Sequence, residues 1–114
     1  MDSCIFCKIA KHTIQSKIVF EGERVIAFED LNPQAPTHIL VIPKKHISTL
    51  NDTLPEDRDL LGEVVLTATE IARDRQIHSS GYRLVCNTNR GAGQAVFHVH
   101  FHLLGGRSLA WPPG

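Results

Sequence analysis

Three histidines alternate with apolar residues near the C-terminus, in the run FHVHFHLL of residues 97–104. Successive side chains of a β-strand point to opposite faces, so a strand here would place His98, His100 and His102 on one face and the apolar side chains on the other. Because imidazole titrates near neutral pH, one ring can act as a neutral nucleophile while a neighbour donates a proton. Imidazole is also a common metal ligand, so the pattern admits a metal site. A purely structural role is the weakest interpretation, since Thr or Lys would suit a solvated face better.

The length and charge of the chain restrict the partners that we expect. Its 114 residues are enough for one domain with a real core, but not for two. The 12 Lys and Arg residues balance the 12 Asp and Glu residues, so the formal net charge is zero. A protein that binds nucleic acid through phosphate attraction needs an excess of positive charge, so no nucleic-acid partner is predicted. A mononucleotide site is compatible with zero charge, because a few backbone amides and imidazoles can bind one phosphate.

The N-terminus carries no positively charged leader followed by an apolar run. No apolar stretch approaches the roughly 20 residues that span a bilayer. The cysteines are odd in number, and Cys4 and Cys7 lie only three residues apart, which is not the disulfide framework of a small secreted protein. We therefore expect a cytoplasmic protein with no membrane partner.

The apolar periodicity predicts an α+β fold. Strands are expected at residues 17–21, 24–29, 37–43, 82–87 and 97–104. A short N-terminal helix is expected over residues 3–9, with Ser3 as its N-cap. A long helix is expected from Thr53, with Glu56 closing a capping box, and should end before residue 79. Its apolar side chains recur at helical spacing and should pack on the sheet: Leu60, Leu61, Val64, Val65, Ala68, Ile71 and Ala72.

Several other residues are ambiguous when each is considered alone. The Cys4-x-x-Cys7 pair fits half of a zinc site, a redox pair or two buried small side chains, and the redox interpretation is weak because no strand precedes it. His38 opens an apolar strand, where a lone histidine is more often a satisfied core residue than a catalyst. The Gly-rich loop at 88–96 offers backbone amides that could bind an anion. Lys44 and Lys45 are interpreted as a solvated bend without a role.

Taken together, these blocks resemble a histidine triad protein of the Hint branch, the histidine triad nucleotide-binding proteins. The defining pattern is His-φ-His-φ-His-φ-φ, where φ is apolar, and it matches the residues from His98 to Leu104. Three further blocks resemble that branch, namely FEDLNPQAPTH at 28–38, GYRLVCN at 81–87 and GGR at 105–107. The resemblance covers nearly the whole chain. It implies one HIT domain over residues 1–114, with an antiparallel sheet, one long packed helix and a short N-terminal helix, assembled as a homodimer.

The resemblance also implies an activity. Such proteins bind purine mononucleotides and hydrolyse the bond between an adenylate phosphorus and an amine, which makes this chain a purine nucleoside phosphoramidase acting on AMP derivatives. By motif, His100 would be the nucleophile that forms a covalent nucleotidyl-histidine. His102 and His38 would donate and relay the proton that the departing amine needs, and His98 completes the catalytic set. The covalent step divides one difficult displacement into two easier ones and requires no metal.

The resemblance further implies a nucleotide site. Asn87 and the backbone amides of Gly93, Ala95 and Val96 would bind the phosphate, and Asp30 would accept hydrogen bonds from the ribose hydroxyls. The base would occupy an apolar slot, and Trp111 would shape the mouth of the site. The slot would be formed by Phe6, Ile9, Ile14, Phe28, Leu31 and Leu40. Many relatives carry a hydroxyl residue at the position of Ala95, so one side-chain donor to the phosphate would be missing here.

The Cys4-x-x-Cys7 pair is absent from many Hint relatives but is similar to a zinc-bearing group of bacterial family members. In those, the implied ligands are Cys4, Cys7, His46 and His98. Two thiolates and two imidazoles are a chemically sensible structural zinc site, which would leave His100 free. The alternative is that the cysteines are reduced thiols and that His46 faces solvent or relays a proton.

Other functions stay open at this stage. The chain could be a nucleotide-binding regulatory or scaffolding protein whose hydrolysis is incidental, because binding and catalytic pockets need nearly the same residues. It could also be a dinucleoside polyphosphate hydrolase, as in a related branch, or a zinc-binding structural module. His102 argues against the transferase-like branch, in which Gln replaces the third histidine.

Overall fold

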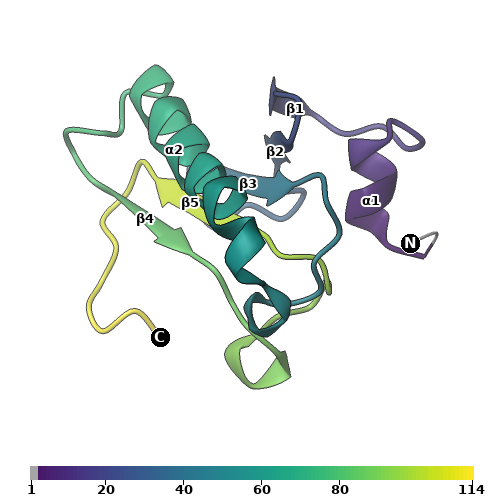
Figure 1. The fold of residues 1–114 in the computed structure, drawn as a ribbon. Coiled ribbons are helices and arrows are strands. Elements are labelled where there is room, and N and C mark those ends of the chain that lie inside the picture. Colours follow the sequence, from purple (N-terminus) through teal and green to yellow (C-terminus); the bar gives the residue numbers. More distant parts are fainter. Residues whose placement is uncertain (1–2) are drawn as a thin grey trace.

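A computed structural model describes residues 3–114, and its centre is a five-stranded antiparallel sheet with the strand order β1-β2-β3-β5-β4 (Figure 1). The strands are β1 (Ile18–Glu21), β2 (Val25–Glu29), β3 (Thr37–Pro43), β4 (Tyr82–Val85) and β5 (Phe101–Gly105). The helices are α1 (Ile5–Ala10), α2 (Arg58–Asp74) and three 3₁₀ turns, η1 (Leu50–Asp52), η2 (Pro55–Asp57) and η3 (Arg90–Ala92). The predicted α+β fold, with one long helix on an antiparallel sheet, is confirmed. None of the helices in this part of the chain has both the length and the apolar character that a bilayer span requires.

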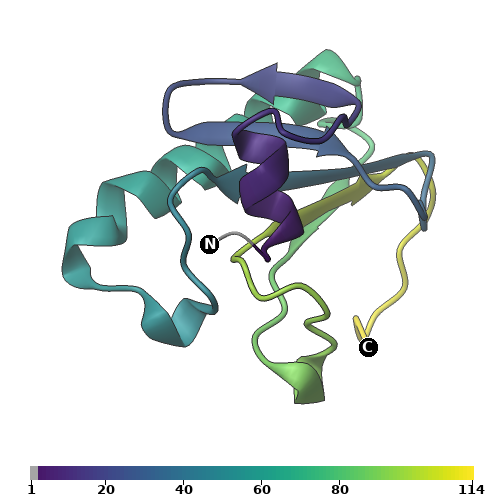
Figure 2. The same ribbon diagram turned by 90° about the vertical axis from the view of Figure 1, so that its right-hand side faces the viewer.

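The two α-helices pack on opposite faces of the sheet (Figures 1 and 2). All seven residues of β3 are buried, because alternate side chains of this strand and of β2 enter two different cores. The core under α2 includes Val25, Ala27, Ile39, Val41 and Leu103. The core under α1 includes Phe6, Ile26, Phe28, Leu40 and Ile42. The strand register pairs His102 with Leu40, so His102 points to the α1 face of the sheet.

The histidine run is a strand only in its second half, so the predicted strand over residues 97–104 is wrong for residues 97–100. β5 begins at Phe101, which pairs with Val41, although β3 continues to Pro43. Before Phe101 the segment forms other hydrogen bonds in place of strand pairing: the Val99 amide donates to the Ile47 carbonyl at 2.7 Å, and the side chain of His98 binds the end of β3, with Nε2 2.7 Å from the Pro43 carbonyl oxygen. His98 and His100 therefore lie in a segment that is outside the paired strands of the sheet.

The start of the long helix also differs from the prediction. α2 begins at Arg58, and two 3₁₀ turns occupy the residues before it. Thr53 is not its N-cap, since the Thr53 hydroxyl donates to the Leu50 carbonyl at 2.7 Å. Asp57, rather than Glu56, closes the turn by accepting the Leu54 amide at 2.8 Å. Several Ser, Thr and Asp residues in this stretch can each cap a turn, and the sequence alone does not rank them.

Smaller differences concern the N-cap of α1 and the α2 stripe. The N-cap of α1 is Cys4, whose Sγ accepts the Cys7 amide at 3.3 Å, and not Ser3. Most of the predicted stripe on α2 is buried, but Leu61 is half-buried and Val65 is exposed. The strand expected over residues 82–87 ends two residues early, at Val85.

Lys45 has a partner that the sequence analysis did not assign. Its Nζ donates to Asp57 Oδ1 at 2.6 Å, and the Asp57 side chain is only 3% exposed. The hydrogen bond from Lys45, followed by that from the Leu54 amide, lowers the pKa of Asp57. The pair joins the loop after β3 to the turn that precedes α2.

Because the pKa of Asp57 is lower in the folded chain than in the unfolded chain, its contribution is present above the unfolded pKa and is lost as pH falls through the folded pKa. We therefore expect Asp57→Asn to lower the free energy of unfolding at pH 7, with the difference from wild type shrinking as the solution is acidified. Denaturant titrations at a series of pH values measure this. Glu56→Gln is the matched control, because the Glu56 side chain is 71% exposed and lies 3.7 Å from Lys45. A deficit for Asp57→Asn that does not change with pH would contradict the role of the ion pair.

Candidate active site and metal-binding cluster

Four of the predicted histidines gather where β3 meets β5 and the segment that precedes it. The rings of His100 and His102 are 5.0 Å apart between centroids, and those of His38 and His102 are 5.1 Å apart. Phe6 of α1 meets the ring of His100 edge-on at 5.1 Å. His98 lies on the other side of His100, toward the cysteines of α1. The structure thus brings the predicted catalytic histidines together, although only His38 and His102 lie on strands.

The hydrogen bonds of His38 determine which ring nitrogens carry hydrogen. The Gln34 amide donates to His38 Nδ1 at 3.0 Å, so a neutral His38 carries its hydrogen on Nε2. His38 Nε2 lies 2.9 Å from His102 Nδ1, which must then be the acceptor. A neutral His102 consequently carries its own hydrogen on Nε2. This chain of bonds leaves His102 as a hydrogen-bond donor through its free Nε2–H.

Asp30 lies beside this pair. Its Oδ2 is 3.4 Å from His38 Nε2, and its Oδ1 accepts the Asn32 amide at 2.7 Å. The carboxylate is therefore fixed by the loop between β2 and β3 and adds negative charge next to the histidines. Asp30, His38 and His102 have ligand atoms within 4.8 Å of one another, as a metal site would. However, His38 Nε2 carries a hydrogen and offers no lone pair, so we interpret this group as a proton-transfer arrangement.

The ring of His100 has the opposite tautomer. Its Nδ1 lies 2.7 Å from the backbone carbonyl oxygen of His98, and a carbonyl can only accept. His100 therefore carries its hydrogen on Nδ1 and has a lone pair on Nε2. The residue is only 6% exposed, and burial lowers its pKa. The arrangement supplies a neutral imidazole with a free lone pair, which is the form that can attack an electrophile.

Burial also keeps the other two triad histidines neutral. It lowers the pKa of His102 to about 4, with a smaller effect from positive charge on His100 and His38. Burial likewise lowers the pKa of His98 to about 4, although the hydrogen bond to the Pro43 carbonyl opposes this. A buried imidazole loses the hydration that would stabilise its charged form. At neutral pH the three rings are therefore all uncharged.

The cysteines of α1 meet two histidines in a compact cluster, which we call the Cys2His2 cluster: Cys4, Cys7, His46 and His98. The nitrogen and sulfur atoms of these four side chains lie within 4.8 Å of one another, close enough to bind one metal ion. His98 Nδ1 is 3.4 Å from Cys4 Sγ and 3.2 Å from His46 Nδ1, and Cys7 Sγ is 3.3 Å from His46 Nδ1. Ligand atoms around a tetrahedral zinc ion would be separated by about 3.3 to 3.8 Å, given the usual bond lengths.

The orientation of His98 also fits a metal ligand. Its Nε2 lies 2.7 Å from the Pro43 carbonyl oxygen, so Nε2 carries the hydrogen and Nδ1 presents a lone pair to the cluster. Metal-bound histidines commonly donate their other N–H to a carbonyl or carboxylate in this way. His98 is completely buried, at 0% exposure, which holds its ring in this position.

The predicted phosphate-binding residues lie on the loop between β4 and β5. Asn87 follows β4, and Gly93 adopts a left-handed conformation, with φ of 96°, at the end of η3. Gln94, which sequence reasoning missed, is buried and fixes this loop. Its side chain accepts the Asn89 amide at 2.7 Å and donates to the carbonyl of Ser48 at 2.8 Å. A glutamine in a Gly-rich loop gives no sequence signal of this role, because its partner at residue 48 is distant in the chain.

The predicted base slot divides into a floor and a rim. Its buried members belong to the core under α1, where Phe6 and Phe28 meet edge-on at 5.3 Å. Ile9 and Leu40 lie in the same core. Ile14 and Leu31 are exposed, the latter by 91%, and line an open cavity of about 540 Å³. Trp111 is exposed on the C-terminal tail.

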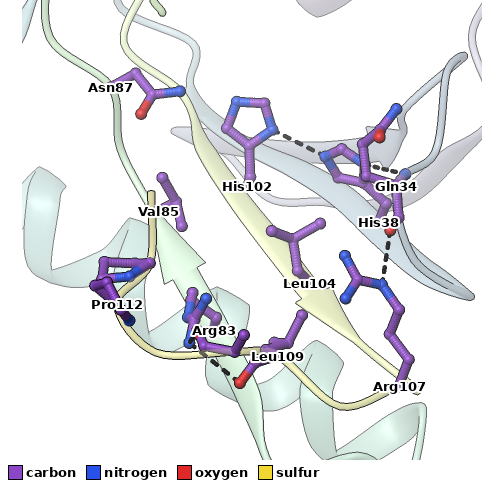
Figure 3. A pocket seen from close by; sticks show the side chains of 12 residues that line it. Gln34, His38, Arg83, Val85, Asn87, His102, Leu104, Arg107, Leu109 and Pro112 are labelled. Atoms are coloured by element: carbon purple, nitrogen blue, oxygen red, sulfur yellow. Dashed lines mark hydrogen bonds between the residues drawn. The ribbon is translucent and has the colours of Figure 1, made fainter. Parts of the chain in front are cut away.

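A second cavity, of about 500 Å³, lies beside the histidine pair and is called here the distal cavity (Figure 3). His38, His102 and Asn87 line one part of it, and Arg83 and Arg107 line another. The C-terminal tail forms a wall through Pro112 and its neighbours. Neither arginine was assigned a role from the sequence.

The chain is similar to known proteins over nearly its whole length. Residues 11–109 match the HIT domain family. The purine nucleoside phosphoramidase of Escherichia coli K12 is 49% identical over 108 residues, which cover 95% of this chain and 91% of that protein. An uncharacterized HIT-like protein of Synechococcus elongatus is 50% identical over 99% of this chain and 98% of its own length. The crystal structure of a HIT family hydrolase from Legionella pneumophila superposes with a TM-score of 0.97 at 51% identity, over 98% of this chain and all of that chain.

The tautomers that follow from the hydrogen bonds can be observed directly. We expect long-range ¹H–¹⁵N spectra at pH 7.5 to show His100 as the Nδ1–H form and His102 as the Nε2–H form, both neutral because burial lowers their pKa values. The chain unfolded in urea is the control, since its histidines should titrate near 6.5. A pKa of 6.5 or above for His102 in the folded protein would contradict this assignment.

Proposed function

The chain belongs to the HIT domain family, and from this we propose that it is a purine nucleoside phosphoramidase that hydrolyses adenosine 5′-phosphoramidates to AMP and an amine. The observation that carries the proposal is the free lone pair on the buried His100 Nε2, next to a donor nitrogen on His102. The 49% identity with the E. coli phosphoramidase supports the same activity. A neutral nucleophile beside a proton donor is what displacement of an amine from phosphorus requires.

In the first step, His100 Nε2 attacks the phosphorus and the phosphorus–nitrogen bond breaks. The bonding electron pair leaves with the nitrogen, which takes up one proton from the His38–His102 pair. The pair enters this step with one extra proton, taken up as the anionic substrate binds, and Asp30, whose Oδ2 lies 3.4 Å from His38 Nε2, would stabilise the resulting imidazolium. The positive charge that His100 acquires as a nucleotidyl-histidine is stabilised by the His98 carbonyl, which accepts its Nδ1–H at 2.7 Å. In the second step, water attacks the phosphorus, returns one proton to the pair and releases AMP, so His100 is restored.

Other residues would bind and orient the nucleotide. The side chain of Asn87 and the amides of the loop at residues 93–96 would bind the phosphate oxygens, where charge develops during the reaction. Asp30 would accept hydrogen bonds from the ribose. The purine would lie over Phe6 and Phe28, whose rings form a rigid apolar floor.

The decisive test is steady-state hydrolysis of a fluorogenic adenosine 5′-phosphoramidate by wild type and by His100→Ala. We expect the variant to lose activity by a factor on the order of 10³ or more, because no other side chain replaces the nucleophile. AMP affinity and metal content should be retained, which separates loss of chemistry from loss of folding. His78→Ala, an exposed histidine on the loop after α2, is the matched control and should be unaffected. If the wild type binds AMP but does not turn over, the protein is a nucleotide-binding module instead.

We also propose that the Cys2His2 cluster binds a structural zinc ion. Two thiolates and two imidazoles complete a tetrahedral site, with no position left for substrate, so zinc would act only on the fold. It would join α1 to the loop after β3 and to the segment before β5, all through side chains that already converge. No step of the reaction passes through it.

We expect about one zinc ion per chain in the purified protein, and loss of most of that zinc in Cys7→Ser. Cobalt substitution should give the thiolate-to-metal absorption band of a tetrahedral site in wild type but not in Cys7→Ser. Cys86→Ser is the matched control, because Cys86 lies outside the cluster and should not affect metal binding. Equal metal content in the two variants would exclude the cluster as the binding site.

The homodimer implied by the resemblance also remains a proposal. β4 is at one edge of the sheet, and α2 exposes Val65 and Leu66 on its outer side. An open strand edge beside exposed apolar side chains is typical of a surface that pairs with a second copy. The mass of the protein in solution distinguishes one chain from two.

A further inference from the structure

We propose that the distal cavity receives the leaving group of the substrate, and that Arg83 and Arg107 select amines that carry an anionic group such as a carboxylate. This inference rests on the proposed phosphoramidase function and specifies its substrate class. It is carried by the place of the cavity, by its charge and by the way in which the fold fixes both arginines.

The sheet register places the cavity directly beside the proton donor. Val85 pairs with His102, and Arg83 pairs with Leu104, so these four side chains share one face of the sheet. Arg83 lies two residues from Val85 on β4, and residues two apart on a strand are separated by about 7 Å along it. Arg83 is therefore about 7 Å along the sheet from the level of His102, the partner of Val85. Figure 3 shows this arrangement, with His102 at one end and the two arginines on either side of Leu104.

Arg107 reaches the cavity through a turn that requires glycine. Gly106 has a φ of 90°, and a Cβ at this position would lie 2.9 Å from the Pro36 side chain. The turn brings Arg107 back against the loop before β3, where its Nε donates to the Gln34 carbonyl at 2.9 Å. Because the Gln34 amide also orients His38, Arg107 is anchored to the same residue as the proton relay.

The charge of the cavity is not neutralised by the described residues. Two arginines line it, and none of its lining residues is an aspartate or glutamate. Arg83 donates through Nη2 to the Ala110 carbonyl at 2.8 Å, and Arg107 donates through Nη1 to the Ser108 carbonyl at 2.9 Å. These carbonyls orient each guanidinium group, but because they are neutral they do not cancel its positive charge. Neither arginine takes part in an ion pair within residues 3–114. A positive, partly enclosed cavity of this kind favours an anion.

The geometry of the displacement assigns the cavity to the leaving group rather than to the base. The nucleophile and the leaving group lie on opposite sides of the phosphorus in an in-line reaction. His100 lies toward Phe6, on the α1 side, and does not line the distal cavity, whereas His102 and Asn87 do. A phosphorus held at Asn87, with His100 behind it, would direct its departing nitrogen past His102 and into the cavity.

The test compares substrates that differ only in charge. AMP phosphoramidates of glycine, β-alanine and 4-aminobutyrate are each paired with the corresponding carboxamide. We expect kcat/KM to be about tenfold or more higher for the carboxylate than for its carboxamide at the best spacing, as expected for a hydrogen bond between charged groups. The three chain lengths locate the distance at which the arginines engage the anion.

Variants then identify the groups that recognise the anion. Arg83→Met and Arg107→Met should each reduce the carboxylate-to-carboxamide ratio of kcat/KM severalfold, and Arg83→Lys should recover part of it. A merely structural role would lower both rates and leave the ratio unchanged. Arg73→Met, an exposed arginine on α2, is the matched control and should keep the wild-type ratio.

The outcomes separate this inference from the proposed function. If the unsubstituted phosphoramidate is hydrolysed but carboxylate and carboxamide react equally, or if the preference survives loss of both arginines, the inference is overturned and the phosphoramidase function stands. If no phosphoramidate is hydrolysed, the proposed function itself fails.

Discussion

The hydrogen bond between His100 Nδ1 and the His98 carbonyl, at 2.7 Å, determines what the rest of the site can do. It fixes the hydrogen of His100 on the nitrogen that faces the backbone, and so leaves the lone pair on the nitrogen that faces outward. The same residue, His98, directs its own Nδ1 lone pair to the cysteines, because its Nε2 is bound to the Pro43 carbonyl. His98 thus uses its carbonyl for His100, its Nε2 for Pro43 and its Nδ1 for the cysteines. The geometry of His100, the proposed nucleophile, and of the Cys2His2 cluster therefore depends on one residue that is completely buried.

The fold supports this residue from both faces of the sheet. The α2 core includes Val99, the residue between His98 and His100, so the backbone there is fixed by apolar packing as well as by its bond to Ile47. On the other face, Phe6 of α1 packs edge-on against the rings of His98 and His100. Residues 97–100 therefore lie outside the strand pairing of the sheet, but their backbone is held in place. The departure from the strand also gives the two histidines their separate directions, because a regular strand would have aligned all three imidazoles.

Local patterns predicted the elements well, and long-range contacts explain the differences. The alternation of histidine and apolar residues predicted a candidate site and the strand from residue 101 onward, since side-chain period is a property of a few neighbouring residues. The start of β5 at Phe101 depends on contacts of the preceding segment with residues more than 50 positions earlier, such as the bond from the Val99 amide to the Ile47 carbonyl. The Lys45–Asp57 pair and the Gln94 contacts likewise join segments whose proximity only the fold creates. The convergence of Cys4, Cys7, His46 and His98 came from resemblance, because spacing alone left the cysteine pair ambiguous.

The arginines of the distal cavity illustrate a limit of composition as evidence. The prediction of no nucleic-acid partner rested on a net charge of zero, which averages over the whole surface. Arg83 comes from β4 and Arg107 from the turn after β5, and only the register and the Gly106 turn place them in one cavity. In that cavity two guanidinium groups without an ion-pair partner among residues 3–114 lie near each other and can both attract one small anion. Selectivity for a small anion therefore requires no excess of basic residues. It requires only that neutral carbonyls hold two arginines beside the proposed path of the leaving group.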